Sequence, residues 1–139
     1  MQTIFLVLLI AVLWGVADLI RKLTIGSNFQ IVSLAFNVGT ILAPLVLIIY
    51  TLAKKNSFKY SFPHLGIAFF GGALAGLGGL LLYYALFKGA GISTIIPIIR
   101  ILSITLVAIG GVLLFGEPVT FKFVFGLVLA LSGVYLILI

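Results

Sequence analysis

The residue with the most evident chemistry in this sequence is Arg100, which lies within the otherwise apolar run IIPIIRILSITLVAIGG. A charged side chain at the centre of a membrane-spanning helix costs about 2.5–3.5 kcal/mol on insertion scales, so it normally faces a cavity or a partner. We therefore expect Arg100 to bind an anionic group or a carbonyl on the path of a solute. In the alternative, the helix begins near Ile95 and the Arg100 side chain extends to the membrane surface.

Asp18 is one of two acidic residues in the chain, and Glu117 is the other. Arg21 and Lys22 follow Asp18 at spacings of three and four, which allows a local ion pair on one side of a helix. In the functional alternative, Asp18 is a titratable carboxylate that exchanges a proton for a substrate and so couples transport. If Arg100 has an acidic partner within the chain, we expect Asp18 rather than Glu117.

Two aromatic residues are candidates for the wall of a binding site. Trp14 lies four residues before Asp18, so the two side chains share one helical face. Its position in the middle of an apolar run favours a cavity wall over the membrane surface. Tyr84 follows Tyr83 near the end of another run, where it either joins an interfacial aromatic belt or lines the substrate site.

Asn37 and Ser103 are polar residues in the middle of apolar runs, and Thr40 and Thr105 accompany them. Hydrogen bonding across helices is the default role of such residues in membrane proteins. Asn37 and Ser103 also remain candidates for substrate binding, because both are placed where a solute would cross.

The sequence offers no constellation typical of soluble enzymes. One histidine and two carboxylates do not make a convincing metal site, and no glycine-rich phosphate loop with a following lysine occurs. Cysteine is absent, which excludes disulfides and thiolate ligands. We therefore expect no enzyme activity, no cofactor and no metal.

The composition indicates that the protein is surrounded by lipid. Hydrophobic residues make up 64% of the 139 residues and charged residues only 7%, against about 25% charged residues in soluble domains. Such a chain can expose this surface only to lipid. The formal net charge is +6, but the basic residues stand mostly between apolar runs, which favours lipid headgroups over nucleic acid as their partner.

Five apolar runs are separable, and each is long enough to cross a hydrocarbon core of roughly 30 Å at about 1.5 Å per residue. The runs do not alternate, which argues against a membrane β-barrel. We expect one all-α, multi-pass domain in the cell membrane, with helices at about 3–20, 29–53, 64–87, 92–115 and 119–139.

Small residues recur every four positions in the third and fifth runs. This spacing lets helix backbones approach closely in lipid, where burial from water gives no driving force. We expect the third helix to pack against other helices rather than against lipid, through stripes that include Gly72, Gly76 and Gly79. The fifth run has a milder stripe with Gly126 and Gly133.

Positive charges in the loops are almost evenly divided between the two sides of a five-helix chain. Lysines and arginines normally mark the cytoplasmic side, but the count here is four against three. The chain is therefore either weakly biased, with its N-terminus inside, or inserts in both orientations. One side carries Lys54, Lys55, Lys59 and Lys122, and the other carries Arg21, Lys22 and Lys88.

Two stretches resemble a known family. LLIAVLWGVADLIRKL, at residues 8–23, is similar to the opening helix of EamA-type domains, and residues 83–138 resemble the end of the same domain. The most specific part is the pair Gly116-Glu117, followed by Gly126 and Gly133 in the last run. The resemblance covers essentially the whole chain and places it in the drug/metabolite transporter superfamily.

The resemblance implies a fold and a mode of assembly. Most members carry two such domains of inverted topology, and inverted repeats enclose a site near the membrane midplane. A single domain would therefore need a second, oppositely oriented copy, as in an antiparallel homodimer. The smaller multidrug-resistance relatives use a central glutamate in the first helix, and Trp14 stands near that place here. Arg100 instead favours an anionic or zwitterionic substrate.

The function predicted from these residues is secondary transport of a small metabolite or drug-like solute by alternating access. One alternative is a flippase subunit for an anionic lipid carrier, with Arg100 meeting a phosphate. Another is a non-transporting membrane subunit that packs through the glycine-rich helix. A polar cavity lined by Arg100 would favour transport, and a dry, packed centre would favour the subunit.

Overall fold

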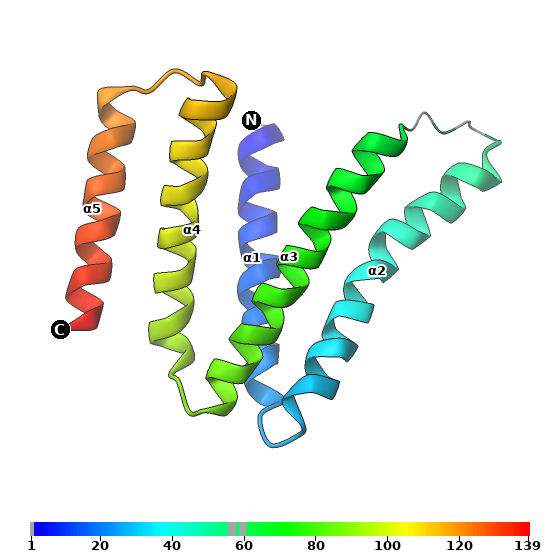
Figure 1. The fold of residues 1–139 in the computed structure, drawn as a ribbon, viewed down its shortest axis with the longest axis horizontal. Helices are drawn as coiled ribbons and strands as arrows, with labels where there is room; N and C mark the ends of the chain where they lie inside the picture. Colours follow the sequence, from blue (N-terminus) through cyan, green and yellow to red (C-terminus); the bar gives the residue numbers. More distant parts are fainter. Residues whose placement is uncertain (1, 56–57, 59–60) are drawn as a thin grey trace. The chain divides into compact units, whose positions relative to one another are not determined.

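The computed structural model describes residues 2–55, 58 and 61–139. This part of the chain is all-helical apart from its loops and one isolated bridge between Ile25 and Ser27. All of its five helices are long and apolar enough to cross a membrane, which confirms the predicted fold class. In chain order they are α1 (Gln2–Leu23), α2 (Phe29–Ala53), α3 (Phe62–Phe87), α4 (Ile92–Phe115) and α5 (Phe121–Leu138) (Figure 1).

Three helix ends differ by two residues or more from the predicted ends, each for a local reason. Helix α1 continues to Leu23, because basic side chains are favourable at the negative end of a helix dipole. Helix α3 begins before Pro63, since proline is tolerated in a first turn. Helix α5 begins at Phe121 because the Thr120 hydroxyl caps it, accepting a hydrogen bond from the Phe123 amide at 3.2 Å.

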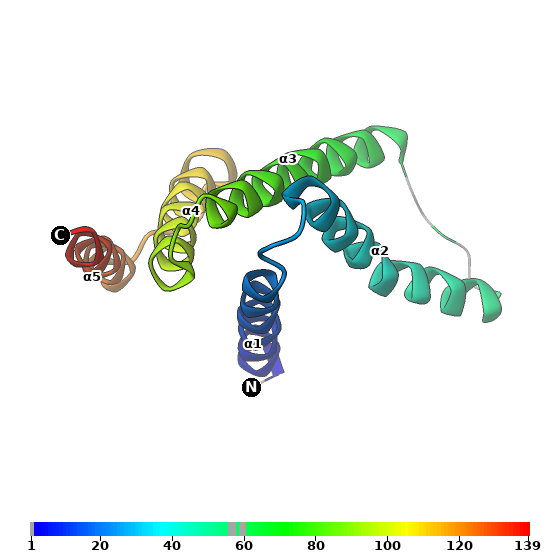
Figure 2. The same ribbon diagram turned by 90° about the horizontal axis from the view of Figure 1, so that it is seen from below.

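The chain divides into two compact units, described separately below. The first comprises residues 1–19 and 90–139, and the second comprises Ile20–Gly89. In the first, α4 and α5 form an antiparallel pair; in the second, α2 and α3 do the same (Figures 1 and 2). Each pair is a helical hairpin with a short connection, so sequence neighbours are also neighbours in space.

The turn after α4 depends on a glycine. Gly116 has φ of 65°, a left-handed conformation that glycine adopts without a steric penalty. Its amide donates to the Val112 carbonyl and the next amide, of Glu117, donates to the Gly111 carbonyl, both at 3.2 Å. These bonds satisfy carbonyls at the end of the helix and turn the chain towards α5.

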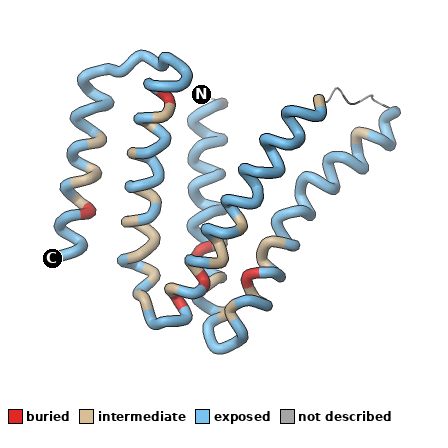
Figure 3. The backbone as a smooth tube through the Cα atoms, viewed as in Figure 1, coloured by how far each residue is buried: buried red, intermediate tan, exposed pale blue. Residues whose placement is uncertain are grey.

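Few side chains are buried within either unit, as Figure 3 shows by its small number of red positions. The buried apolar side chains are Tyr83, Leu86 and Val134, and the buried polar ones are Asp18 and Ser33. Most leucine, isoleucine, valine and phenylalanine side chains are exposed. In a bilayer these exposed side chains contact lipid, so the few buried polar groups become the places where function is sought.

Candidate functional site

The clearest polar site joins α1 and α4 in the first unit. The Arg100 guanidinium donates a hydrogen bond from Nη2 to Oδ2 of Asp18 at 2.8 Å, across 82 residues of sequence. Asp18 was the acidic partner predicted for Arg100, and the structure confirms this pairing. Helix α4 begins at Ile92, so the alternative in which the helix starts near Ile95 is wrong.

Trp14 completes this cluster. Its indole lies one helical turn before Asp18 on α1, and the guanidinium carbon of Arg100 stands 4.8 Å from the ring centroid. A cation over the face of tryptophan is attracted by about 0.5–2 kcal/mol, depending on how far it is desolvated. The ring and the carboxylate, both from α1, therefore hold the charged end of one α4 side chain.

Burial differs sharply between the two charged partners. The Asp18 side chain is 7% exposed, whereas the Arg100 side chain is 41% exposed. An arginine carries five N–H donors, and the structure shows one hydrogen bond from Arg100 among the described residues. The buried carboxylate thus holds the guanidinium, while the remaining donors are open to the surroundings. Such donors suit a planar anion, which accepts two parallel hydrogen bonds from a guanidinium.

Comparison with known proteins places the whole chain in one family. The sequence model of the EamA-like transporter family matches residues 1–139. The chain belongs to the EamA-like transporter family. It is also 34% identical over 135 residues to an uncharacterized protein of Methanocaldococcus jannaschii, an alignment that covers 96% of this chain and 94% of the relative. No solved structure matches the chain.

Membership of the EamA family confirms the predicted resemblance and the place in the drug/metabolite transporter superfamily. This EamA chain is a multi-pass integral membrane protein, and its family consists of transporters. The cluster of Arg100, Asp18 and Trp14 is therefore a candidate solute site.

The remaining predicted site residues of this EamA protein divide between the two units. Ser103 belongs to the first unit with Trp14 and Arg100, whereas Asn37 and Tyr84 belong to the second. Tyr84 is 44% exposed and packs edge-on against Phe29, with ring centroids 5.4 Å apart. Neither unit by itself brings all the predicted substrate-binding residues together.

Among the described residues, the four polar side chains that were expected to bond across helices bond within their own helices instead. Asn37 donates to the Ser33 carbonyl at 2.8 Å and to the Ser33 hydroxyl at 3.5 Å, both within α2. Ser103 donates to a carbonyl of α4 one turn earlier, at 2.7 Å, and Thr40 and Thr105 likewise bond within their own helices. The prediction of interhelical hydrogen bonds was wrong, because a short polar side chain can reach the preceding turn without any neighbouring helix.

Sequence reasoning missed a second cation site in this EamA protein. The Arg21 guanidinium carbon stands 4.1 Å from the Phe36 ring centroid and 5.8 Å from that of Tyr83. These rings come from α2 and α3, are 6.0 Å apart and meet edge to face. No local spacing connects the three residues, so only the packing of α2 on α3 reveals the arrangement.

Gly111 was also missed, although the Gly116-Glu117 pair was recognised. Gly111 is buried, and a Cβ placed on it would lie 2.7 Å from the Glu117 carboxylate oxygen Oε2. Glycine therefore leaves room for the Glu117 side chain to fold back over the end of α4. The sequence signal was present as a glycine six residues before an acidic residue, a spacing without meaning until the turn is known.

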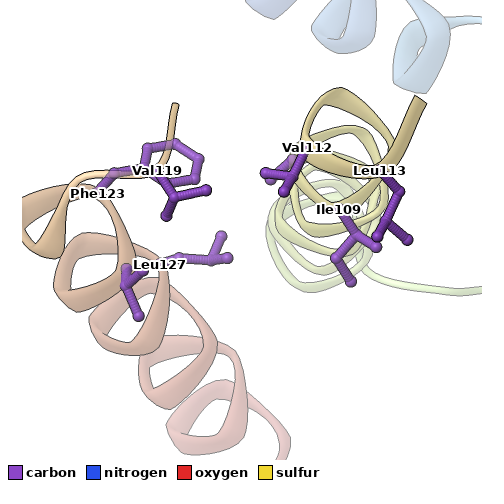
Figure 4. Close-up of a pocket in the computed structure, with 8 residues that line it drawn as sticks. Ile109, Val112, Leu113, Val119, Phe123 and Leu127 are labelled. Atoms are coloured by element: carbon purple, nitrogen blue, oxygen red, sulfur yellow. The ribbon is translucent and has the colours of Figure 1, made fainter. Parts of the chain in front are cut away.

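An apolar groove of about 240 Å³ lies between α4 and α5 (Figure 4). Its lining side chains, among them Ile109, Val112, Phe123 and Leu127, are all apolar. A groove without polar groups cannot orient a charged solute, so this groove does not suit the binding of an anion.

The glycine stripes have different surroundings within their units. A Cβ on Gly76 would lie 3.8 Å from Asn37 Oδ1, and one on Gly79 would lie 4.0 Å from Asn37 Nδ2. These two glycines therefore face α2. Cβ atoms on Gly72, Gly126 and Gly133 would meet nothing within 4 Å, so packing through these three remains a prediction for an assembly larger than one chain.

Leucine in place of Gly76 is expected to loosen the α2–α3 hairpin. Alanine fits at ordinary contact distance from Asn37, but a leucine side chain must push α2 away, and overpacking of this kind costs about 1–3 kcal/mol. Thermal unfolding of the purified protein in detergent should therefore show a lower midpoint for Gly76→Leu and little change for Gly76→Ala.

Gly72→Leu is the matched control, since it gains the same helix propensity in open space. Equal midpoints for Gly72→Leu and Gly76→Leu would show that the contact with Asn37 is not what limits side-chain size at position 76.

Proposed function

We propose that this protein transports a small organic anion or zwitterion across the membrane by alternating access, with Arg100 as the residue that binds the anionic group. The observation that carries the proposal is the Arg100 side chain, which is 41% exposed and which buried Asp18 holds through a hydrogen bond of 2.8 Å. A guanidinium has five N–H donors, and this contact uses one of them. The pair therefore leaves donors of Arg100 for a solute.

The depth of Arg100 supports the same function. It is eight residues into a 24-residue helix whose other side chains carry no charge. A charge at such depth persists where it meets protein, water or a ligand. Asp18 and Trp14 supply the protein contacts, and the open side of the guanidinium is then accounted for by water and solute in a central cavity.

We propose further that two copies assemble in opposite orientations, so that the pair encloses the site. The nearly even loop charges, four against three, allow both orientations. Inverted repeats place their binding site at the interface between the two halves. In the single chain Trp14 is 59% exposed, and a second copy would convert this open side into one wall of a shared cavity.

The experiment that tests the function is solute flux into proteoliposomes. Purified protein is reconstituted and offered a panel of labelled organic anions, zwitterions and cations, with and without a pH gradient. Uptake of at least one anion or zwitterion above that of protein-free liposomes is expected, and cations should not enter. Uptake confined to cations would contradict the role of Arg100, and uptake of none, with flipping of fluorescent anionic lipids, would favour a flippase.

A further inference from the structure

We infer that the substrates are monocarboxylates with an apolar, planar body, and that Trp14 is the residue that selects for that body. This inference rests on the proposed function and adds the chemical class of the solute. Three features of the cluster on α1 and α4 support it. They are the orientation of the Arg100 guanidinium, the net charge of the cluster, and the aromatic surface of Trp14 beside Arg100.

The guanidinium is fixed in orientation by its two contacts. Trp14 lies against it at 4.8 Å from carbon to ring centroid, and Asp18 engages Nη2 at 2.8 Å. A planar group held both by a ring and by a hydrogen bond has less freedom to turn than one held by the hydrogen bond alone. The open edge is therefore presented in one direction, which favours the parallel pair of hydrogen bonds that a carboxylate accepts.

The charge of the cluster favours a single negative charge on the solute. Asp18 and Arg100 together are formally neutral, and Arg100 is the only charged residue of α4. When a monoanion binds, the cluster and its ligand carry one net negative charge. A phosphate has a charge of about −1.5 to −2 near neutral pH, so its complex would carry almost twice the net charge.

The surface beside the open donors is apolar and aromatic. Trp14 is 59% exposed, although the guanidinium carbon of Arg100 stands 4.8 Å from its ring centroid. A carboxylate bound at Arg100 brings the group attached to it over the exposed part of the indole. Covering roughly 55 Å² of apolar surface in this way strengthens binding about tenfold, so a bare carboxylate such as acetate should bind more weakly than benzoate.

The test compares three probes in the reconstituted protein. Binding of benzoate, acetate and inorganic phosphate is measured by isothermal titration calorimetry for the wild type, Trp14→Ala and Trp14→Phe, with Arg100→Ala as the blank for partition into lipid. We expect benzoate to bind more tightly than acetate in the wild type. Trp14→Ala should lower the ratio of benzoate affinity to acetate affinity by about tenfold, because both probes lose the ring that holds Arg100 but only benzoate loses the contact of its own ring, and Trp14→Phe should restore part of that ratio.

Each other outcome has a definite meaning. If Trp14→Ala weakens benzoate and acetate equally, Trp14 only positions Arg100 and the inference about the solute body is overturned, while the anion site stands. If inorganic phosphate binds as tightly as benzoate, the inference about charge is overturned. If none of the three anions binds the wild type at millimolar concentration beyond the Arg100→Ala blank, the proposed function itself fails.

Discussion

Arg100→Ala is expected to abolish solute uptake while the protein still inserts and assembles. Each hydrogen bond to a charged group contributes about 1.5–3 kcal/mol, so loss of a two-point contact should lower uptake by about a hundredfold or more. Arg100→Lys should recover only part, because an ammonium group lacks the planar fork. The measurement is uptake in proteoliposomes, normalised to the amount of reconstituted protein.

The ion pair with Asp18 requires a control for folding. Removing one partner of a fully buried pair costs about 3–5 kcal/mol, and the cost here should be smaller because Arg100 is 41% exposed. The double variant Asp18→Asn, Arg100→Gln keeps similar shapes without the charges. Normal uptake by Arg100→Ala would remove Arg100 from the solute site. Failure of Arg100→Ala to fold, with recovery in the double variant, would make the pair structural.

Two added lysines are expected to fix the chain in one orientation and to remove most of its activity. Asn56→Lys with Ser57→Lys raises the positive charges on one side from four to six, against three on the other. Positive loops are retained in the cytoplasm, so all copies would then face one way. A C-terminal tag, probed for accessibility from each side, should be found on both sides for the wild type and on one side for this variant.

The complementary variant makes this result decisive. Lys54→Gln with Lys55→Gln leaves two positive charges against three and should bias the chain the other way. Each variant alone should transport poorly, and co-expression should restore uptake. Full activity of the lysine variant alone, or a wild-type tag found on one side in more than about nine-tenths of molecules, would contradict the antiparallel homodimer.

The helices were predictable because a membrane-spanning helix requires a run of about 20 apolar residues, which can be recognised in the sequence. The partner of Arg100 was predictable for a different reason: the chain has only two acidic residues, and Asp18 was favoured over Glu117. Trp14 followed from its helical spacing to Asp18. These inferences used the number of acidic residues and the helical spacing, and neither requires knowledge of how the helices pack.

Other parts of the site depended on packing that no local pattern contains. Phe36 and Tyr83 stand over Arg21 only because α2 packs on α3. Gly111 accommodates the Glu117 carboxylate only because Gly116 turns the chain in a left-handed conformation. Ser103 could have bonded to its own helix or to another, and sequence alone does not distinguish these choices.

The most direct test of the central claim uses Trp14, the only tryptophan in the chain. If its indole borders a water-filled anion site, iodide should quench its fluorescence more strongly in the wild type than in Arg100→Ala, because the guanidinium concentrates anions beside the ring. Neutral acrylamide should quench both proteins alike, and lipids with brominated acyl chains should have little effect. Strong quenching by brominated lipids, with none by iodide, would show that Trp14 and Arg100 face the bilayer and would contradict an anion site.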